Sequence, residues 1–231
     1  TLDLDNLVFN VESYEELDKG FDFYAAQTFS DKNQEKVMFA WAGQGEFEYP
    51  TNKNMWAHCL TFPRRLNLIN GILVQNPSRS LELLKENTFS DKGVFEGVKV
   101  IENEDNTYHL KLTFNIEKTD KFGVNLTVSD EEKLIIEFDK KNQKVKLDRS
   151  QLKNKFVEEY GMVRQSNCNL EEKLEVEILV DNSIAEIFIN GGEVAMTTRI
   201  FPLYKSKNIE FFSNDEITYE YSKSMLKSSI K

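Results

Sequence analysis

The chain has 231 residues, of which 40% are apolar and 12% aromatic, so it can fold around one large or two modest hydrophobic cores. Its 39 acidic and 29 basic residues give a formal charge of −10, which repels nucleic acid and anionic membrane surfaces. We therefore expect no nucleic-acid partner. No run of about 18 apolar residues occurs either, so we expect no membrane-spanning helix.

The first 76 residues predict short strands that are rich in aromatic side chains. The aromatic residues between positions 21 and 62 are Phe21, Phe23, Tyr24, Phe29, Phe39, Trp41, Phe47, Tyr49, Trp56 and Phe62. This density is typical of a β-propeller blade, a four-stranded sheet whose aromatic side chains fill the wedge between neighbouring blades. Because one blade cannot bury both of its faces alone, we expect the chain to be part of a truncated propeller.

A second region begins near residue 77. The polar stretch 77–80 predicts the junction, and residues 81–85 predict one short helical turn or an entering strand. From about residue 94, apolar and polar residues alternate with a period of two, which indicates strands with one face toward a core. The runs 110–116 and 122–128 alternate in this way on either side of a short polar turn, so they predict a hairpin.

Further strands follow to the end of the chain. Alternating or apolar runs at residues 174–180, 184–189 and 194–200 are separated by short turns, and Asn190-Gly191-Gly192 can adopt the positive φ values that a tight turn needs. Shorter runs at 209–212 and 217–221 continue the series. We therefore expect an antiparallel β-sandwich from residue 77 to residue 231, and an all-β chain.

Cysteine and histidine are too sparse to indicate a disulfide framework or a metal site. Cys59 and Cys168 lie in unrelated predicted strands, so we expect two free thiols, which weakly favours a reducing compartment. His58 and His109 fall in different predicted domains and have no cysteine, aspartate or glutamate at ligand spacing. Neither a metal ion nor a cofactor is expected.

Several stretches carry recognisable phrases. In chain order they lie at residues 17–29 (Leu-Asp-Lys-Gly-Phe-Asp-Phe-Tyr-Ala-Ala-Gln-Thr-Phe), 38–43 (Met-Phe-Ala-Trp-Ala-Gly), 48–51 (Glu-Tyr-Pro-Thr), 56–64 (Trp-Ala-His-Cys-Leu-Thr-Phe-Pro-Arg), 147–150, 180–192 and 199–202. Together they resemble the invertase-like family 32 glycoside hydrolases, which join a five-bladed propeller to a C-terminal β-sandwich. Lys19 departs from the aromatic residue usual there. The resemblance assigns residues 1–76 to the end of the fourth blade and the fifth blade, and 77–231 to the sandwich.

The resemblance also implies a reaction. Retaining glycosidases of this kind use one carboxylate as nucleophile and another as general acid/base, roughly 5 Å apart across the scissile bond. In the family these groups belong to Asn-Asp-Pro-Asn and Glu-Cys phrases, and a third, stabilising aspartate belongs to Arg-Asp-Pro. This sequence contains no Asp-Pro and no Glu-Cys pair. We expect no catalytic residue here, and interpret the chain as an inactive C-terminal part of a β-fructofuranosidase acting on sucrose or sucrose 6-phosphate.

Three residues are candidates for contact with substrate, because the matching family positions lie near the funnel of the propeller. Asp18 could accept paired hydrogen bonds from sugar hydroxyls, or could instead be a turn residue before Gly20. Tyr24 and Trp41 could offer a sugar an apolar platform, or could instead fill the wedge between blades.

Two other functions stay open. The sandwich could be a carbohydrate-binding module, or it could be purely structural and brace the last blade, in which case the exposed blade would self-associate. The partner implied by the resemblance is a fructose-containing saccharide, whose phosphorylation the sequence leaves undecided. Bacterial-style phrases and the lack of predicted disulfides favour a cytoplasmic location.

Overall fold

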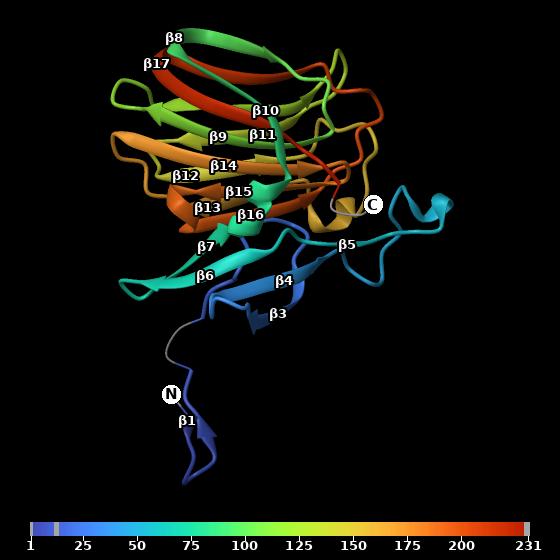
Figure 1. Cartoon of the computed structure of the whole chain (residues 1–231), viewed down its shortest axis with the longest axis vertical. Coiled ribbons are helices and arrows are strands. Elements are labelled where there is room, and N and C mark those ends of the chain that lie inside the picture. Colours follow the sequence, from blue (N-terminus) through green and yellow to red (C-terminus); the bar gives the residue numbers. More distant parts are fainter. Residues whose placement is uncertain (1, 12–13, 229–231) are drawn as a thin grey trace.

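The alternation of apolar and polar residues produces an almost entirely β structure, seen in a computed structural model that describes residues 2–11 and 14–228 (Figure 1). These residues form a two-stranded hairpin, a small sheet and a ten-stranded sheet. The hairpin joins β1 (Leu2–Asp3) to β2 (Val8–Phe9) and projects away from the rest of the molecule. No helix in the described part of the chain has the length and apolar character needed to span a bilayer.

The small sheet contains the aromatic-rich strands. Its strands are β3 (Tyr24–Ser30), β4 (Lys36–Ala42), β5 (Cys59–Leu60), β6 (Arg64–Ile69) and β7 (Ile72–Pro77). They are antiparallel in the order β3-β4-β6-β7, and β5 adds to β4. Met38, Ala40 and Ala42 of β4 are buried on the side of the sandwich, whereas Trp41 between them is 38% exposed. The sheet thus has one face covered by the sandwich and one face exposed.

Short 3₁₀-helices occur in the connections, and ten strands form the large sheet. The helices are η1 (Asn52–Asn54), η2 (Arg79–Leu84), η3 (Glu158–Tyr160) and η4 (Asn190–Gly192), and the strands are β8 (Lys85–Glu102), β9 (Thr107–Asn115), β10 (Lys121–Val128), β11 (Leu134–Asp139), β12 (Lys144–Asp148), β13 (Val163–Asn167), β14 (Lys173–Asp181), β15 (Ile184–Ile189), β16 (Val194–Arg199) and β17 (Asn208–Leu226).

Strand β17 bends this one sheet into the two layers of a sandwich. Its first half pairs with β10 up to Ser213, and its second half pairs with β9 from Thr218 onward, with a register shift between them. Strand β8 runs beside both halves. One layer therefore continues through β10-β11-β12-β13, and the other through β9-β14-β15-β16. The all-β expectation of a blade followed by a sandwich is confirmed.

The predicted hairpin between residues 110–116 and 122–128 is wrong. Strands β9 and β10 do not pair with each other, because β17 lies between them in the sheet order. Their connection crosses from one layer to the other, and Phe114 of β9 meets Phe122 of β10 across the core, with ring centroids 5.6 Å apart. Alternation predicts which side chains are buried, but it does not select the partner strand.

The predicted meander agrees with the structure, and the last two predicted strands differ from it. Strands β14, β15 and β16 form a continuous antiparallel meander, and Asn190, Gly191 and Gly192 all have positive φ in its turn. Residues 81–85, predicted as either a short helical turn or an entering strand, contain the end of one and the start of the other. The 3₁₀-helix η2 ends at Leu84 and the strand β8 begins at Lys85. The last two predicted strands are one bent strand, β17.

Candidate functional site

Strand β16 (Val194–Arg199) is the last strand of the large sheet, and its outer edge is covered by the segment 18–22, which leads into the small sheet. The Lys19 amide donates to the carbonyl of Ala195 at 2.8 Å, and the Phe21 amide donates to the carbonyl of Thr197 at 2.7 Å. Strand β16 pairs with β15 on its other side and ends the sheet. Without this segment, the outer carbonyl groups of β16 would be an open sheet edge.

Two aspartates complete the same contact. The Oδ1 atom of Asp18 accepts the amide hydrogen of Thr197 at 2.8 Å, and Oδ2 of Asp22 accepts that of Arg199 at 2.8 Å. Carboxylates therefore take the place of the carbonyls that a neighbouring strand would present. The outward carbonyls of Ala195 and Thr197 and the outward amides of Thr197 and Arg199 thus have hydrogen-bond partners, as buried backbone requires.

Two glycines allow this close approach. A Cβ atom on Gly20 would lie 2.1 Å from the carbonyl oxygen of Thr197, and one on Gly192 would lie 2.0 Å from that of Gln75. Both obstacles are backbone atoms, which cannot rotate away. The two positions therefore require glycine wherever the blade and the sandwich meet at this distance.

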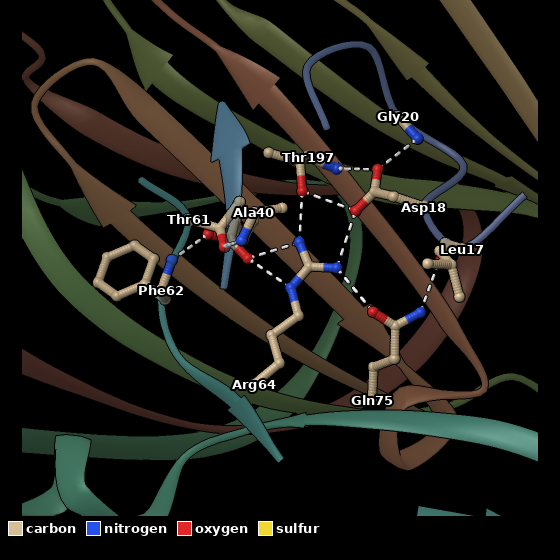
Figure 2. A network of polar contacts seen from close by, with 10 residues as sticks. Leu17, Asp18, Gly20, Ala40, Thr61, Phe62, Arg64, Gln75 and Thr197 are labelled. Atoms are coloured by element: carbon tan, nitrogen blue, oxygen red, sulfur yellow. Dashed lines mark hydrogen bonds and ion pairs between the residues drawn. The ribbon is translucent and has the colours of Figure 1, made fainter. Parts of the chain in front are cut away.

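Arg64 of β6 is the centre of the buried contact (Figure 2). Its Nη1 donates to Asp18 and to Gln75, at 2.9 Å each. Its Nε and Nη2 both donate to Oε2 of Glu186, at 2.9 and 2.6 Å, and Nη2 also donates to the hydroxyl of Thr197. These five bonds use all five donors that a guanidinium has. The side chain is completely buried, so each of these bonds is shielded from water.

Glu186 reaches this site from the sandwich. It lies in the otherwise apolar strand β15, is completely buried, and accepts the amide hydrogen of Phe62 at 2.6 Å besides its bonds from Arg64. Burial opposes the charge on Arg64, but the carboxylates of Glu186 and Asp18 outweigh it and hold the pKa of Arg64 above its ordinary value. The arginine is therefore a fixed positive charge between two acids.

A second buried ion pair lies alongside. Arg149 donates from Nη1 to Oδ2 of Asp22 at 3.0 Å, and the hydroxyl of Tyr49 donates to Oδ1 at 3.5 Å. Burial raises the pKa of the Asp22 carboxyl, and the neighbouring Arg149 opposes that shift. The Arg199 side chain bonds instead to the carbonyls of Ser183, Ala42 and Ala57.

Together these groups form what we name the interdomain charge cluster. Its members are Arg64, Arg149, Arg199, Asp18, Asp22 and Glu186. All six are less than a tenth exposed, and their three positive and three negative formal charges cancel. Buried charges are tolerated when an opposite charge or hydrogen bonds compensate them, and each member here has an ion pair or hydrogen bonds. The cluster therefore holds the small sheet against the sandwich, and its geometry does not suggest acid–base catalysis.

The structure places Asp18 inside this cluster. Its two oxygens accept four hydrogen bonds, from the amides of Gly20 and Thr197, the hydroxyl of Thr197 and the guanidinium of Arg64. Four is about the full acceptor capacity of a carboxylate, so no acceptor is left for sugar hydroxyls in this arrangement. Of the two roles that the sequence left open, this location favours the turn and the ion pair. A sugar contact through Asp18 stays a prediction.

Tyr24 and Trp41 lie elsewhere, on the exposed face of the small sheet. They are register partners on β3 and β4, with ring centroids 6.4 Å apart and a 45° angle between the planes. Tyr24 is 60% exposed and Trp41 is 38% exposed. The structure brings these two candidates together and separates them from Asp18, which faces the sandwich. They form an amphipathic aromatic pair with accessible ring surface.

Sequence reasoning missed most of the charge cluster. The signal for Glu186 was present, since a glutamate inside the apolar run 184–189 must have a partner if that strand is buried on both faces. Nothing in the sequence identifies Arg64 as its partner, because 122 positions separate the two. In the described residues, no group of three histidine, cysteine, aspartate or glutamate side chains could hold a metal ion.

Comparisons with known proteins agree with this architecture. Residues 1–77 match the glycosyl hydrolases family 32 N-terminal domain model, and residues 75–228 match the family 32 C-terminal model. The chain is 32% identical over 94% of its length to a sucrose-6-phosphate hydrolase of Staphylococcus xylosus, covering 44% of that protein. It thus spans less than half the length of that relative.

Solved structures show the same arrangement. The sucrose-6-phosphate hydrolase of Lactobacillus gasseri is 29% identical and superposes with a TM-score of 0.82 over 92% of this chain and 43% of that one. An exo-inulinase of Aspergillus awamori, at 23% identity, gives a TM-score of 0.82 over 99% of this chain and 47% of that one. The second likeness shows the fold alone.

Proposed function

This chain belongs to glycosyl hydrolase family 32, and from that premise we propose that it is the C-terminal part of a β-fructofuranosidase that hydrolyses sucrose or sucrose 6-phosphate. The match to both family domains carries this proposal. The name of the S. xylosus relative supports a sucrose 6-phosphate substrate, and the 44% coverage of that relative supports a part rather than the whole of such an enzyme.

We propose that the chain contributes substrate contacts and no catalytic carboxylate. The retaining mechanism needs a nucleophile and an acid/base on opposite sides of the glycosidic bond. The sequence lacks the Asp-Pro and Glu-Cys pairs that would carry them, and the buried acids Asp22 and Glu186 are committed to arginines. The exposed pair Tyr24 and Trp41 is left as the surface that a fructosyl unit can contact.

The direct test is an assay of the purified 231-residue chain with sucrose and sucrose 6-phosphate. We expect no release of reducing sugar above a boiled control. The gene should also encode an Asn-Asp-Pro-Asn phrase upstream in the same frame, and co-expression of that upstream segment should restore hydrolysis. Turnover by the chain alone would contradict the absence of catalytic groups, and an upstream frame without the phrase would contradict the assignment.

The substrate contact can be tested in the enzyme that carries the upstream segment. Trp41→Ala removes most of one ring platform and should raise the KM for sucrose by about tenfold, while Trp41→Phe, which keeps an aromatic face, should raise it less. Phe29→Ala is the matched control, because Phe29 is 50% exposed on β3 and stacks on Phe39 rather than on Trp41. Equal effects of the two alanine substitutions would contradict a specific contact.

We further propose that the sandwich has a bracing role and that the exposed blade face self-associates when nothing covers it. Apolar exposure on this face supports the proposal, since Tyr24, Phe29, Trp41 and Leu60 are each at least 38% exposed. Sedimentation velocity of the isolated chain should show concentration-dependent association. A monodisperse monomer across the micromolar range would count against it.

A binding module is the second candidate function, and one feature favours it. A groove of about 330 Å³ crosses the outer face of the second layer, lined by polar side chains that include Lys111, Thr113, Glu175, Glu177 and Ser222. Calorimetric titration with sucrose and fructans tests this candidate. Binding that is lost in Lys111→Ala and kept in Trp41→Ala would support it, and no heat at millimolar ligand would exclude it.

We propose a cytoplasmic location for the protein. The two cysteines, Cys59 and Cys168, are free, which supports a reducing compartment. Cell fractionation with an antibody to the chain tests it, and recovery of the protein from the culture medium would contradict it.

A further inference from the structure

The imidazole of His58 lies between two aromatic rings, one on β4 and one in the connection between β4 and η1. It meets Trp41 at a centroid distance of 4.7 Å and an angle of 89°, and it meets Tyr49 at 5.1 Å and 87°. Both contacts are edge-to-face, the arrangement that aromatic rings prefer. The three rings therefore form a chain in which His58 is the only link between Tyr49 and Trp41 among the ring contacts of the described residues.

The position of His58 is set by shape. Its Nε2 atom is buried and has no hydrogen-bond partner in the described part of the chain, so polar contacts do not hold that side of the ring. On another side lies the α-carbon of Gly43, where an added Cβ would be 2.3 Å from Cδ2 of the imidazole. The ring consequently fits a slot formed by Trp41, Tyr49 and Gly43.

Tyr49, at the other end of the chain of rings, is fixed by the sandwich. Its ring lies 5.4 Å from that of Phe156 and 6.0 Å from that of Phe201, and the Arg199 guanidinium lies 5.3 Å from its centroid. Its hydroxyl accepts the Gln44 amide at 3.0 Å. Tyr49 is only 3% exposed and cannot shift without disturbing the sandwich.

We propose that His58 is a positioning residue for Trp41, and that through His58 and Tyr49 the sandwich sets the tilt of the indole on the exposed face. The consequence of this positioning for sugar binding rests on the proposed function, in which Trp41 contacts the fructosyl unit. The sandwich then does more than stabilise the blade, because it orients one wall of the sugar site.

The experiment uses the 231-residue chain with Trp56→Phe, which leaves Trp41 as the single tryptophan. Emission maximum, acrylamide quenching and near-ultraviolet circular dichroism then report on one indole. His58→Ala should shift the emission to the red and increase quenching, and His58→Phe should restore both signals because it keeps an aromatic edge. His109→Ala is the matched control, since that histidine is buried in the sandwich against Glu177.

A second pair of variants moves the imidazole without removing it. Gly43→Ala crowds the His58 ring and should give the same red shift, whereas Gly71→Ala, which also has a positive φ but open space around its α-carbon, should leave the spectrum unchanged. This pair decides the question if His58→Ala does not fold.

An unchanged Trp41 signal in both His58→Ala and Gly43→Ala would overturn the proposal. Equal shifts in His58→Ala and His109→Ala would overturn it as well, because they would indicate general loosening. In the enzyme with the upstream segment, His58→Ala should weaken sugar binding roughly two- to tenfold. A spectral shift without any effect on sugar would leave the positioning intact and contradict the proposed role of Trp41 instead.

Discussion

Replacing Arg64 by methionine tests whether the interdomain charge cluster holds the blade to the sandwich. The substitution keeps the length and apolar volume of the side chain but removes five hydrogen bonds, three of them to the carboxylates of Asp18 and Glu186. Those two side chains are at most 1% exposed, so water cannot replace the guanidinium. Breaking a buried pair in this way costs about 3–5 kcal/mol of unfolding free energy. Set against a total of roughly 5–15 kcal/mol for a folded domain, the loss leaves the chain marginal.

Urea denaturation followed by far-ultraviolet circular dichroism and by tryptophan fluorescence measures this loss. A double variant, Arg64→Met with Glu186→Gln, should recover at least ~2 kcal/mol, because it removes the acid that depends most on the arginine. Asp18 keeps its bonds from Gly20 and Thr197 in either case. Because the tryptophans are in the blade and most of the strands are in the sandwich, the two probes should follow a single transition in the wild type and separate transitions in Arg64→Met.

The matched control is Arg79→Met. Arg79 faces Glu35 at 3.4 Å with 74% of its side chain exposed, so its loss should cost less than about 1 kcal/mol. A similar small loss in Arg64→Met would refute the reasoning, and so would a double variant less stable than Arg64→Met alone. Coincident transitions in Arg64→Met would show that the cluster is not what joins the two parts.

Three further changes have definite outcomes. Gly20→Ala should destabilise the chain by more than ~2 kcal/mol in urea titrations, because its Cβ would lie 2.1 Å from the carbonyl oxygen of Thr197, and an equally stable variant would contradict the edge pairing. Burial raises the pKa of the Cys168 thiol to about 12 and also raises that of Cys59, so Ellman's reagent at pH 8 should react slowly with the folded chain and fully with both thiols in guanidinium. Burial disfavours the charge on Glu177, yet its bonds to the imidazole of His109 and the ammonium group of Lys111 hold its pKa below the usual range. Its stabilisation is therefore present above the unfolded pKa of about 4.3 and lost as the pH falls through the lowered pKa of the folded chain, so Glu177→Gln should cost about 1–2 kcal/mol at pH 7 and progressively less in acid, whereas a constant difference would contradict the shift.

Local patterns predicted the strands well because burial of one face imposes a period of two on the sequence itself. The meander of β14, β15 and β16 followed from alternation and one glycine-rich turn. The same pattern misled at β9 and β10, where the short connection crosses between layers and a strand from the end of the chain comes between them. Strand β17 starts some 80 residues after β10 ends, and no local feature announces such a distant partner.

The candidate site residues likewise differ in how far local sequence indicates their surroundings. Tyr24 and Trp41 could be named as candidates from the family phrases alone, and their exposure on one face of a strand pair agrees with alternation along β3 and β4. Asp18 lies in an equally recognisable phrase, but its carboxylate is taken up by Arg64 and Thr197, which reach it from the blade and from the sandwich. A family phrase can therefore mark a residue that stabilises the fold just as well as a residue that contacts substrate.

By itself the sequence determined the all-β character, the order of blade and sandwich, the family and the lack of its catalytic phrases, because each is written in contiguous residues. Only the tertiary structure decided which strands are neighbours, and that three arginines and three acids cancel inside the interface. It alone places His58 between Trp41 and Tyr49. The physical reason is that charge pairing and ring packing depend on distance in space, and the chain brings these groups together only after both sheets have formed.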